Sequence, residues 1–111
     1  MTEFSYCKLE IFVPESHLEA VRGALQSVDA GHIGGYDCCL SYSPVTSCWR
    51  PLAGTRPYLG QIGEVCTARE IKVEVTCPAE TAGLAVAAVK AVHPYEEPVI
   101  NVIPLFRTSF S

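Results

Sequence analysis

Residues 6–14 of this 111-residue chain, Tyr6-Cys7-Lys8-Leu9-Glu10-Ile11-Phe12-Val13-Pro14, decide the fold. Apolar side chains occupy every second position from Cys7 to Val13, which is the period of a strand with one buried face. Pro14 ends that strand because proline has no backbone N–H to donate to a neighbouring strand. A strand over residues 6–13 is therefore predicted.

A helix is predicted next, ending at about Val28. Ser16 and Glu19 have the spacing of a capping box, in which the two side chains satisfy free backbone N–H groups at the start of a helix. One apolar stripe at helical spacing faces the core, formed by Leu18, Val21, Leu25 and Val28. The glycine-dense residues 31–35 then predict a sharp turn, followed by a second strand over residues 36–43.

The same pattern recurs 64 residues later. Lys72-Val73-Glu74-Val75 matches Lys8-Leu9-Glu10-Ile11, and Pro78 matches Pro14. In the helix predicted over residues 79–92, hydrophobicity suggests an inner stripe of Leu84, Ala88, Ala91 and Val92. The helix stripes of the two halves also coincide, since Val21, Leu25 and Val28 fall on Ala85, Val89 and Val92.

Two strand–helix–strand units predict an α+β, ferredoxin-like βαββαβ sandwich with a four-stranded antiparallel sheet and both helices on one face. Further strands are predicted over residues 64–77 and 99–106. Residues 44–63 form an extra strand or loop, with an edge strand near residues 47–50 and a plain turn at residues 60–63. A chance similarity of two strand–proline–helix units remains the alternative, and it leads to the same α+β class.

Composition limits the classes of partner. Hydrophobic residues make up 49% of the chain and charged residues 18%, which excludes disorder and fits a single domain over residues 1–111. The net charge of −4 disfavours nucleic acid. No run of 18 apolar residues and no basic leader is found, so we expect no membrane span and a cytoplasmic location.

The six cysteines are expected to be reduced thiols. No Cys-x-x-Cys spacing occurs, and Cys7 and Cys77 lie in strand patterns that need a small apolar residue. Cys38 and Cys39 are expected to point to opposite faces of a strand. A disulfide framework is the alternative that the even count leaves open.

Candidate site residues lie in two corresponding turns. Residues 31–37 (the 31–37 turn) offer His32, Tyr36 and Asp37, and residues 93–98 (the 93–98 turn) offer His93, Tyr95, Glu96 and Glu97. We expect the turns to converge on one ligand site, within the chain or across a subunit boundary. Imidazole and carboxylate groups suit a divalent metal such as zinc, manganese, iron or copper, with His32, His93 and Glu97 as its ligands.

Several readings of these residues stay open. Each histidine could instead stabilise the end of its own helix. No catalytic residue is predicted, because no nucleophile lies in a recognisable catalytic context. The leading hypothesis is a regulatory small-ligand or metal-binding module. The alternatives are a metal-dependent hydrolase using Glu96 or Glu97, and a purely structural assembly domain.

Self-association is predicted from the sheet face that the helices leave open. Apolar side chains are expected there, and such a patch seldom stays bare in a monomer. They are Tyr6, Phe12, Trp49, Ile100, Val102 and Phe106.

Four segments together resemble one known domain: residues 12–15 (Phe-Val-Pro-Glu), the 31–37 turn, residues 50–52 (Arg-Pro-Leu) and the 93–98 turn. The chain resembles, over residues 6–105, the domain inserted in many bacterial members of the NIF-three-like (NGG-one-interacting-factor-three-like) family. The resemblance implies a CutA/PII-like fold, here free-standing, and a homo-oligomer in which a trimer is favoured over a dimer. Dinuclear metal ligands of such proteins lie in flanking domains and correspond to no residue here. Cys38 stands where similar sequences often have histidine.

Overall fold

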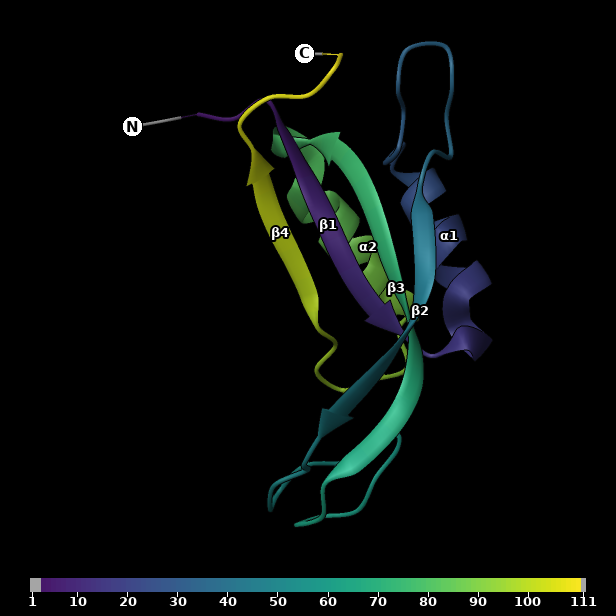
Figure 1. Cartoon of the computed structure of the whole chain (residues 1–111), viewed down its shortest axis with the longest axis vertical. Helices are drawn as coiled ribbons and strands as arrows, with labels where there is room; N and C mark the ends of the chain where they lie inside the picture. The colour runs from purple at the N-terminus through teal and green to yellow at the C-terminus, as the bar shows by residue number, and fades with distance from the viewer. Residues whose placement is uncertain (1–2, 111) are drawn as a thin grey trace.

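A computed structural model describes residues 3–110 and contains one four-stranded antiparallel sheet. Its strands are β1 (Tyr6–Val13), β2 (Ser41–Trp49), β3 (Cys66–Pro78) and β4 (Ile100–Leu105). They lie in the order β2-β3-β1-β4 (Figure 1). The predicted βαββαβ order and antiparallel sheet are confirmed.

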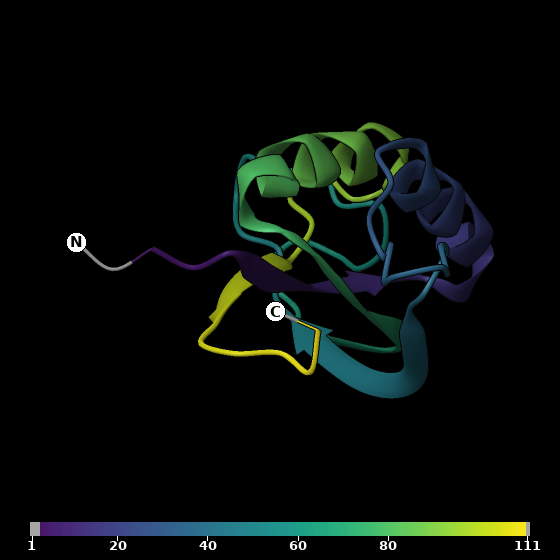
Figure 2. The ribbon, with the colours of Figure 1, turned by 90° about the horizontal axis from the view of Figure 1, so that it is seen from above.

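Two helices, α1 (Leu18–Ser27) and α2 (Ala82–Val92), lie on the same face of the sheet (Figure 2). Each follows a single 3₁₀ turn, η1 (Glu15–His17) or η2 (Ala79–Thr81). Ser16 does not cap a helix, since its hydroxyl lies 2.8 Å from Nδ1 of His17 and neither η1 nor α1 has a side-chain cap. The capping-box prediction is therefore wrong.

The core lies between the helices and the inner face of the sheet. Cys7, Leu9, Ile11 and Val13 alternate inward from β1, as the sequence predicted. In α2 the buried residues are Ala82, Ala85 and Val89, while Leu84 is 63% exposed. The predicted inner stripe of α2 is therefore wrong at Leu84 and at Ala91, which is also exposed, because the smaller Ala82 and Ala85 lie against the core instead.

Two ion pairs reflect the internal repeat. Lys8 Nζ lies 2.7 Å from Glu74 Oε2, and Lys72 Nζ lies 3.2 Å from Glu10 Oε2. Glu10 and Glu74 are directly opposite in the β1–β3 register. Two like charges would repel there, so each carboxylate needs the lysine that lies diagonally across from it.

The second strand is displaced along the chain from its predicted position. Residues 33–36 form a tight turn in which the N–H and C=O groups of Ile33 and Tyr36 bond each other at 2.8 and 3.0 Å. β2 begins only at Ser41 and absorbs the separately predicted edge strand. Pro44 is tolerated because β2 is an edge strand, where a missing N–H costs no sheet hydrogen bond.

Beyond the end of β1, β2 and β3 continue as a two-stranded arm. β1 stops at Val13, opposite Ile71, while β2 and β3 stay paired as far as Trp49 and Cys66. Residues 50–65 close the arm as a loop (Figure 1). The radius of gyration, 15.1 Å, exceeds the roughly 13 Å of a compact domain of this length because the arm projects.

The open face of the sheet differs from the prediction. Ile100 pairs with Ile11 and Val102 with Leu9, so both lie on the helix side, and the charged pairs occupy the middle of the open face. Phe106 follows β4 and is 84% exposed. The predicted apolar patch is therefore wrong for Ile100 and Val102, whereas Tyr6 and Phe12 alternate with the inward residues of β1 and lie on the open face as predicted.

All six cysteines fall within the described residues, and all are free thiols. Cys38 and Cys39 precede β2 rather than lying in a strand, and Cys38 has a left-handed backbone with φ of 57°. The expectation of opposite strand faces is therefore wrong. No helix within residues 3–110 is both long enough and apolar enough to cross a membrane.

Candidate functional site

The two turns lie at opposite ends of the sheet. The N–H of Gly31 donates to Thr76 O, whereas the His93 ring reaches Phe12 O, and Phe12 pairs with Lys72. Four residues of β3 separate these anchor points, or about 13 Å at the usual rise of a strand. Convergence of the turns within one chain is therefore wrong, and convergence across a subunit boundary stays a prediction.

The 31–37 turn continues the end of α1. Asp29 has φ of 57°, and the N–H groups of Asp29 and Ala30 donate to the carbonyls of Gln26 and Leu25, both at 3.0 Å. This is the Schellman arrangement, which usually has glycine at the left-handed position. The helix end is thus closed by backbone hydrogen bonds rather than by an imidazole.

His32 is exposed and joins two parts of its own loop. Its Nδ1 lies 3.0 Å from a carboxylate oxygen of Asp29, and its Nε2 lies 3.0 Å from Gly34 O. The bond to Asp29 raises the pKa of His32. Tyr36 is 76% exposed and Asp37 is also exposed. Ile33 of this turn lines a hollow of about 430 Å³ beside Cys39 and Glu74, but none of the predicted site residues lines it.

His93 is buried and both of its ring nitrogens are engaged. Nε2 donates to Phe12 O at 2.7 Å, and Nδ1 accepts the N–H of Tyr95 at 3.1 Å. These partners require the neutral tautomer with its proton on Nε2, and burial lowers the pKa of His93 accordingly. In this arrangement neither nitrogen is free to bind a metal, and the ring instead holds the start of the 93–98 turn against β1.

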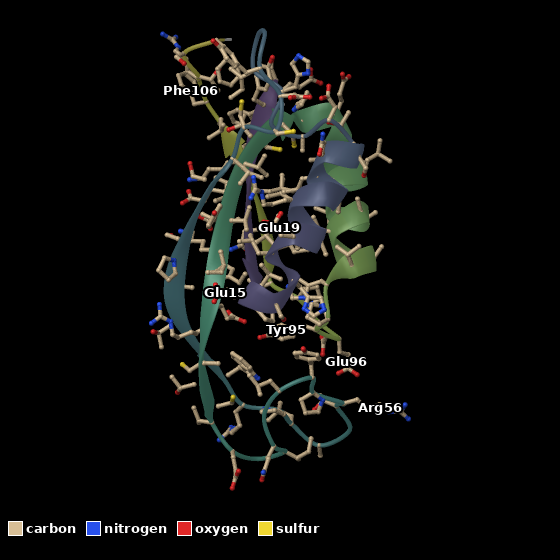
Figure 3. The ribbon with its side chains drawn as sticks, turned by 90° about the vertical axis from the view of Figure 1, so that its right-hand side faces the viewer. Glu15, Glu19, Arg56, Tyr95, Glu96 and Phe106 are labelled. Atoms are coloured by element: carbon tan, nitrogen blue, oxygen red, sulfur yellow. The ribbon has the colours of Figure 1, made fainter. Side chains whose placement is uncertain are left out.

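A pocket of about 510 Å³ opens beside the 93–98 turn, between that turn and the arm. We call it the 93–98 pocket. Its lining includes Phe12, Trp49, Glu70, Tyr95, Glu96 and Glu97. Tyr95 and Glu96 lie near Arg56 of the loop, at the opposite end of the molecule from Phe106 (Figure 3). Three of the seven predicted site residues thus line one pocket.

Tyr95 and Glu70 form the polar centre of the pocket. The Tyr95 hydroxyl is hydrogen-bonded to the Glu70 carboxylate, and burial together with this bond raises the pKa of Tyr95. Glu70 is only 4% exposed. No lysine or arginine among residues 3–110 forms an ion pair with Glu70. The pocket therefore contains a buried acidic group that forms no ion pair with a lysine or arginine of the described residues.

Aromatic rings form much of the wall. The ring centroid of Tyr95 lies 5.7 Å from that of Trp49, 5.8 Å from that of Tyr58 and 5.0 Å from that of His93. The Trp49 indole N–H donates to Leu59 O at 3.2 Å, which anchors the loop to the arm. The backbone N–H of Arg56 donates to Glu96 Oε1 at 3.3 Å, which ties the loop to the turn.

The pocket is not preformed for a metal ion. Within residues 3–110, no three histidine, cysteine, aspartate or glutamate side chains are placed to hold one. His32, His93 and Glu97 do not meet in one chain, so a metal bound by all three would have to be shared between copies.

Glu70, Trp49 and Tyr58 are functional candidates that the sequence reasoning missed. Glu70 lies in a strand where alternation alone predicts an exposed position, yet it is buried beside Tyr95 of the 93–98 turn. Trp49 was assigned to the open sheet face. A tryptophan in a proline- and glycine-rich segment was the one available signal, since large aromatic residues often line binding sites.

Comparison with known proteins supports the resemblance. No family model matches the chain. The GTP cyclohydrolase 1 type 2 homolog of Halalkalibacterium halodurans is 39% identical over 104 residues, which are 94% of this chain and 28% of that protein. The chain thus spans little more than a quarter of the length of the curated relatives that it matches.

Solved structures show the same fold. A Bacillus cereus protein related to NIF3 superposes with a TM-score of 0.82 at 33% identity, over 96% of this chain and 27% of that one. The periplasmic divalent cation tolerance protein CutA of Archaeoglobus fulgidus gives 0.70 at 22% identity, over 93% and 86%. The PII-like protein CutA of Nostoc sp. PCC 7120 gives 0.67 at 20%, over 90% and 81%. The predicted CutA/PII-like fold and the resemblance to a segment of NIF3-related proteins are confirmed.

Proposed function

We propose that this chain, a relative of a segment of the NIF3-related proteins, is a small-ligand-binding module whose site is the 93–98 pocket. The observation that carries this proposal is a pocket of about 510 Å³ with aromatic walls and a buried acidic group. Ligand sites are commonly apolar hollows of 300–1,000 Å³ with a few polar groups that orient the ligand.

The arrangement supports binding rather than catalysis. Tyr95 and Glu70 bond each other, and His93 is held by two backbone groups. Among the described residues, no hydrogen bond is found that joins any of these three side chains to a serine, threonine or cysteine, as an activated nucleophile would require. A metal-dependent hydrolase would need a metal ion whose ligands come from more than one copy of the chain. The metal-binding version of this module would need the same.

The proposal is tested by blocking the pocket. A fragment library containing neutral, cationic and anionic compounds is screened against the chain by ligand-observed NMR. Ser47→Phe adds a ring to the lining. Its matched control is Ser43→Phe, which lies two pleat repeats away on the same face of the same edge strand and outside the lining. We expect hits that Ser47→Phe removes and Ser43→Phe keeps. Finding no hit, or hits that both variants keep, contradicts the proposal.

We further propose that the module works as a homo-oligomer, with a trimer favoured over a dimer. β2 is a nine-residue edge strand, and the loop that follows it exposes a group of large apolar side chains. Of these, Ile62 and Val65 lie outside the lining of the 93–98 pocket, whereas Leu52, Tyr58 and Leu59 belong to it. Exposed edges and apolar patches of this kind are usually covered by another chain.

Light scattering tests the assembly. A trimer predicts a particle three times the 12.0 kDa of the chain, and Ile62→Glu, which puts a charge on the loop, should reduce its mass. A particle of monomer mass at high protein concentration would rule out the oligomer. If the chain is a purely structural assembly domain, it should form the same oligomer, but no fragment should bind in a way that Ser47→Phe abolishes.

A further inference from the structure

The chemistry of the 93–98 pocket narrows the class of its ligand, an inference that rests on the function proposed above. We propose that the pocket binds a small organic cation, an ammonium group carried on an apolar body. Three features of the pocket support this class: its excess of acidic side chains, its buried acid without an ion pair, and its aromatic wall.

Acidic side chains outnumber basic ones around the pocket. Glu70, Glu96 and Glu97 line it, while Arg50 is the one lysine or arginine in its lining. Arg50, Glu96 and Glu97 are exposed, so water screens their charges strongly. Glu70 is buried, so water would screen an ion pair with its carboxylate less than one with the exposed groups.

Glu70 has unused capacity to accept hydrogen bonds. A carboxylate has about four acceptor positions, and the Tyr95 hydroxyl occupies one of them. A buried carboxylate is costly unless a cation pairs with it. Neither a lysine nor an arginine of the described chain pairs with Glu70, and neutral His93 does not supply the charge. A cationic ligand would supply the missing partner.

The aromatic wall favours an organic cation over a metal ion. The ring centroids of Trp49 and Tyr58 each lie within 6 Å of that of Tyr95, and Phe12 lines the same pocket. The faces of such rings attract ammonium groups, above all methylated ones that carry little bound water. A metal ion would need a tight cluster of ligands, and the described residues contain no such cluster.

The only tryptophan of the chain lines this pocket, so intrinsic fluorescence reports binding directly. The probes are choline and 3,3-dimethyl-1-butanol, which has nearly the same shape but carries carbon in place of the charged nitrogen. We expect choline to bind at least tenfold more tightly. Glu70→Gln keeps the shape of the side chain and should abolish that preference, while Glu80→Gln, an exposed acid in η2 outside the pocket, should preserve it.

The outcomes separate this inference from the proposed function. Equal binding of both probes, or a choline preference that survives in folded Glu70→Gln, overturns the cation inference and leaves the pocket a ligand site. The same conclusion follows if choline does not bind but fragments do, and Ser47→Phe abolishes the binding of those fragments. If neither choline nor any fragment binds, both proposals fall. The comparison of the two probes on the unmodified chain decides the inference even if Glu70→Gln does not fold.

Discussion

Replacing His93 by alanine tests whether this histidine is a structural element of the site or a metal ligand. The substitution removes the bond to Phe12 O, the bond from the Tyr95 N–H and the ring packed 5.0 Å from Tyr95. Each lost hydrogen bond costs about 0.5–1.5 kcal/mol, and the missing ring leaves a small cavity. We expect the free energy of unfolding to fall by about 2–4 kcal/mol in total.

Urea denaturation at pH 7.5, followed by circular dichroism, measures this loss. His32→Ala is the matched control, because His32 also has two hydrogen bonds but is exposed, and its loss should cost less than about 1 kcal/mol. Each protein is measured with and without a chelator. The structural role predicts that the chelator changes nothing in any of them.

Two results would refute this reasoning. One is a loss for His93→Ala no larger than that for His32→Ala, which would mean that the buried contacts contribute little. The other is a chelator effect on the unmodified chain that disappears in His93→Ala. That result would make His93 a metal ligand, and its hydrogen bonds would then belong to a metal-free state only.

Three further predictions concern stability. Burial lowers the pKa of His93, so the stability contributed by the neutral ring is complete above the usual pKa of 6.5 and is lost as the pH falls towards the folded-state pKa. The free energy of unfolding, measured from pH 7.5 to 5, should show this loss. An equally steep dependence on pH in His93→Gln would contradict the assignment to His93. Gly31→Ala should destabilise the protein by about 2 kcal/mol or more, because the new Cβ would lie 2.4 Å from Cys39 O and the residue has a φ of +84°. Gly23→Ala, in a helix and with no atom near the new Cβ, should instead stabilise it by about 0.5–1 kcal/mol. Thermal melts that rank the two variants in the opposite order would contradict the backbone geometry. Lys8→Met removes the ion pair with Glu74, whose two side chains are about one-third exposed. The free energy of unfolding should fall by no more than about 1 kcal/mol in low salt, and by less at 1 M salt. A larger loss, or one that does not depend on salt, in urea titrations would contradict a surface ion pair.

The fold was largely predictable because local patterns and the repeat agree. Alternation in β1 placed its four inward residues correctly, and the match of Lys8 and Glu10 with Lys72 and Glu74 corresponds to the two ion pairs between β1 and β3. The sequence places β2 wrongly because β2 is an exposed edge strand, in which apolar and polar side chains hardly alternate. The tight turn at residues 33–36 also uses residues that resemble the start of a strand.

The site was predicted only in part. Tyr95, Glu96 and Glu97 line the pocket, but similar sequence positions in the two halves did not imply proximity. In an antiparallel duplicated unit the two helices run in opposite directions, so the turns that follow them emerge at opposite ends of the sheet. The contribution of Glu70 and Trp49 depends on how the arm twists towards the 93–98 turn, which no local pattern encodes.

Mapping a bound ligand by amide chemical shifts tests the central claim most directly, namely that one end of the domain carries the site. The strongest hit from the fragment screen is titrated into ¹⁵N-labelled protein. The account predicts saturable shifts in residues 93–99 and 47–59, with residues 31–37 unchanged. Saturable shifts centred on residues 31–37, or shifts of equal size at both ends of the sheet at one ligand stoichiometry, would contradict it.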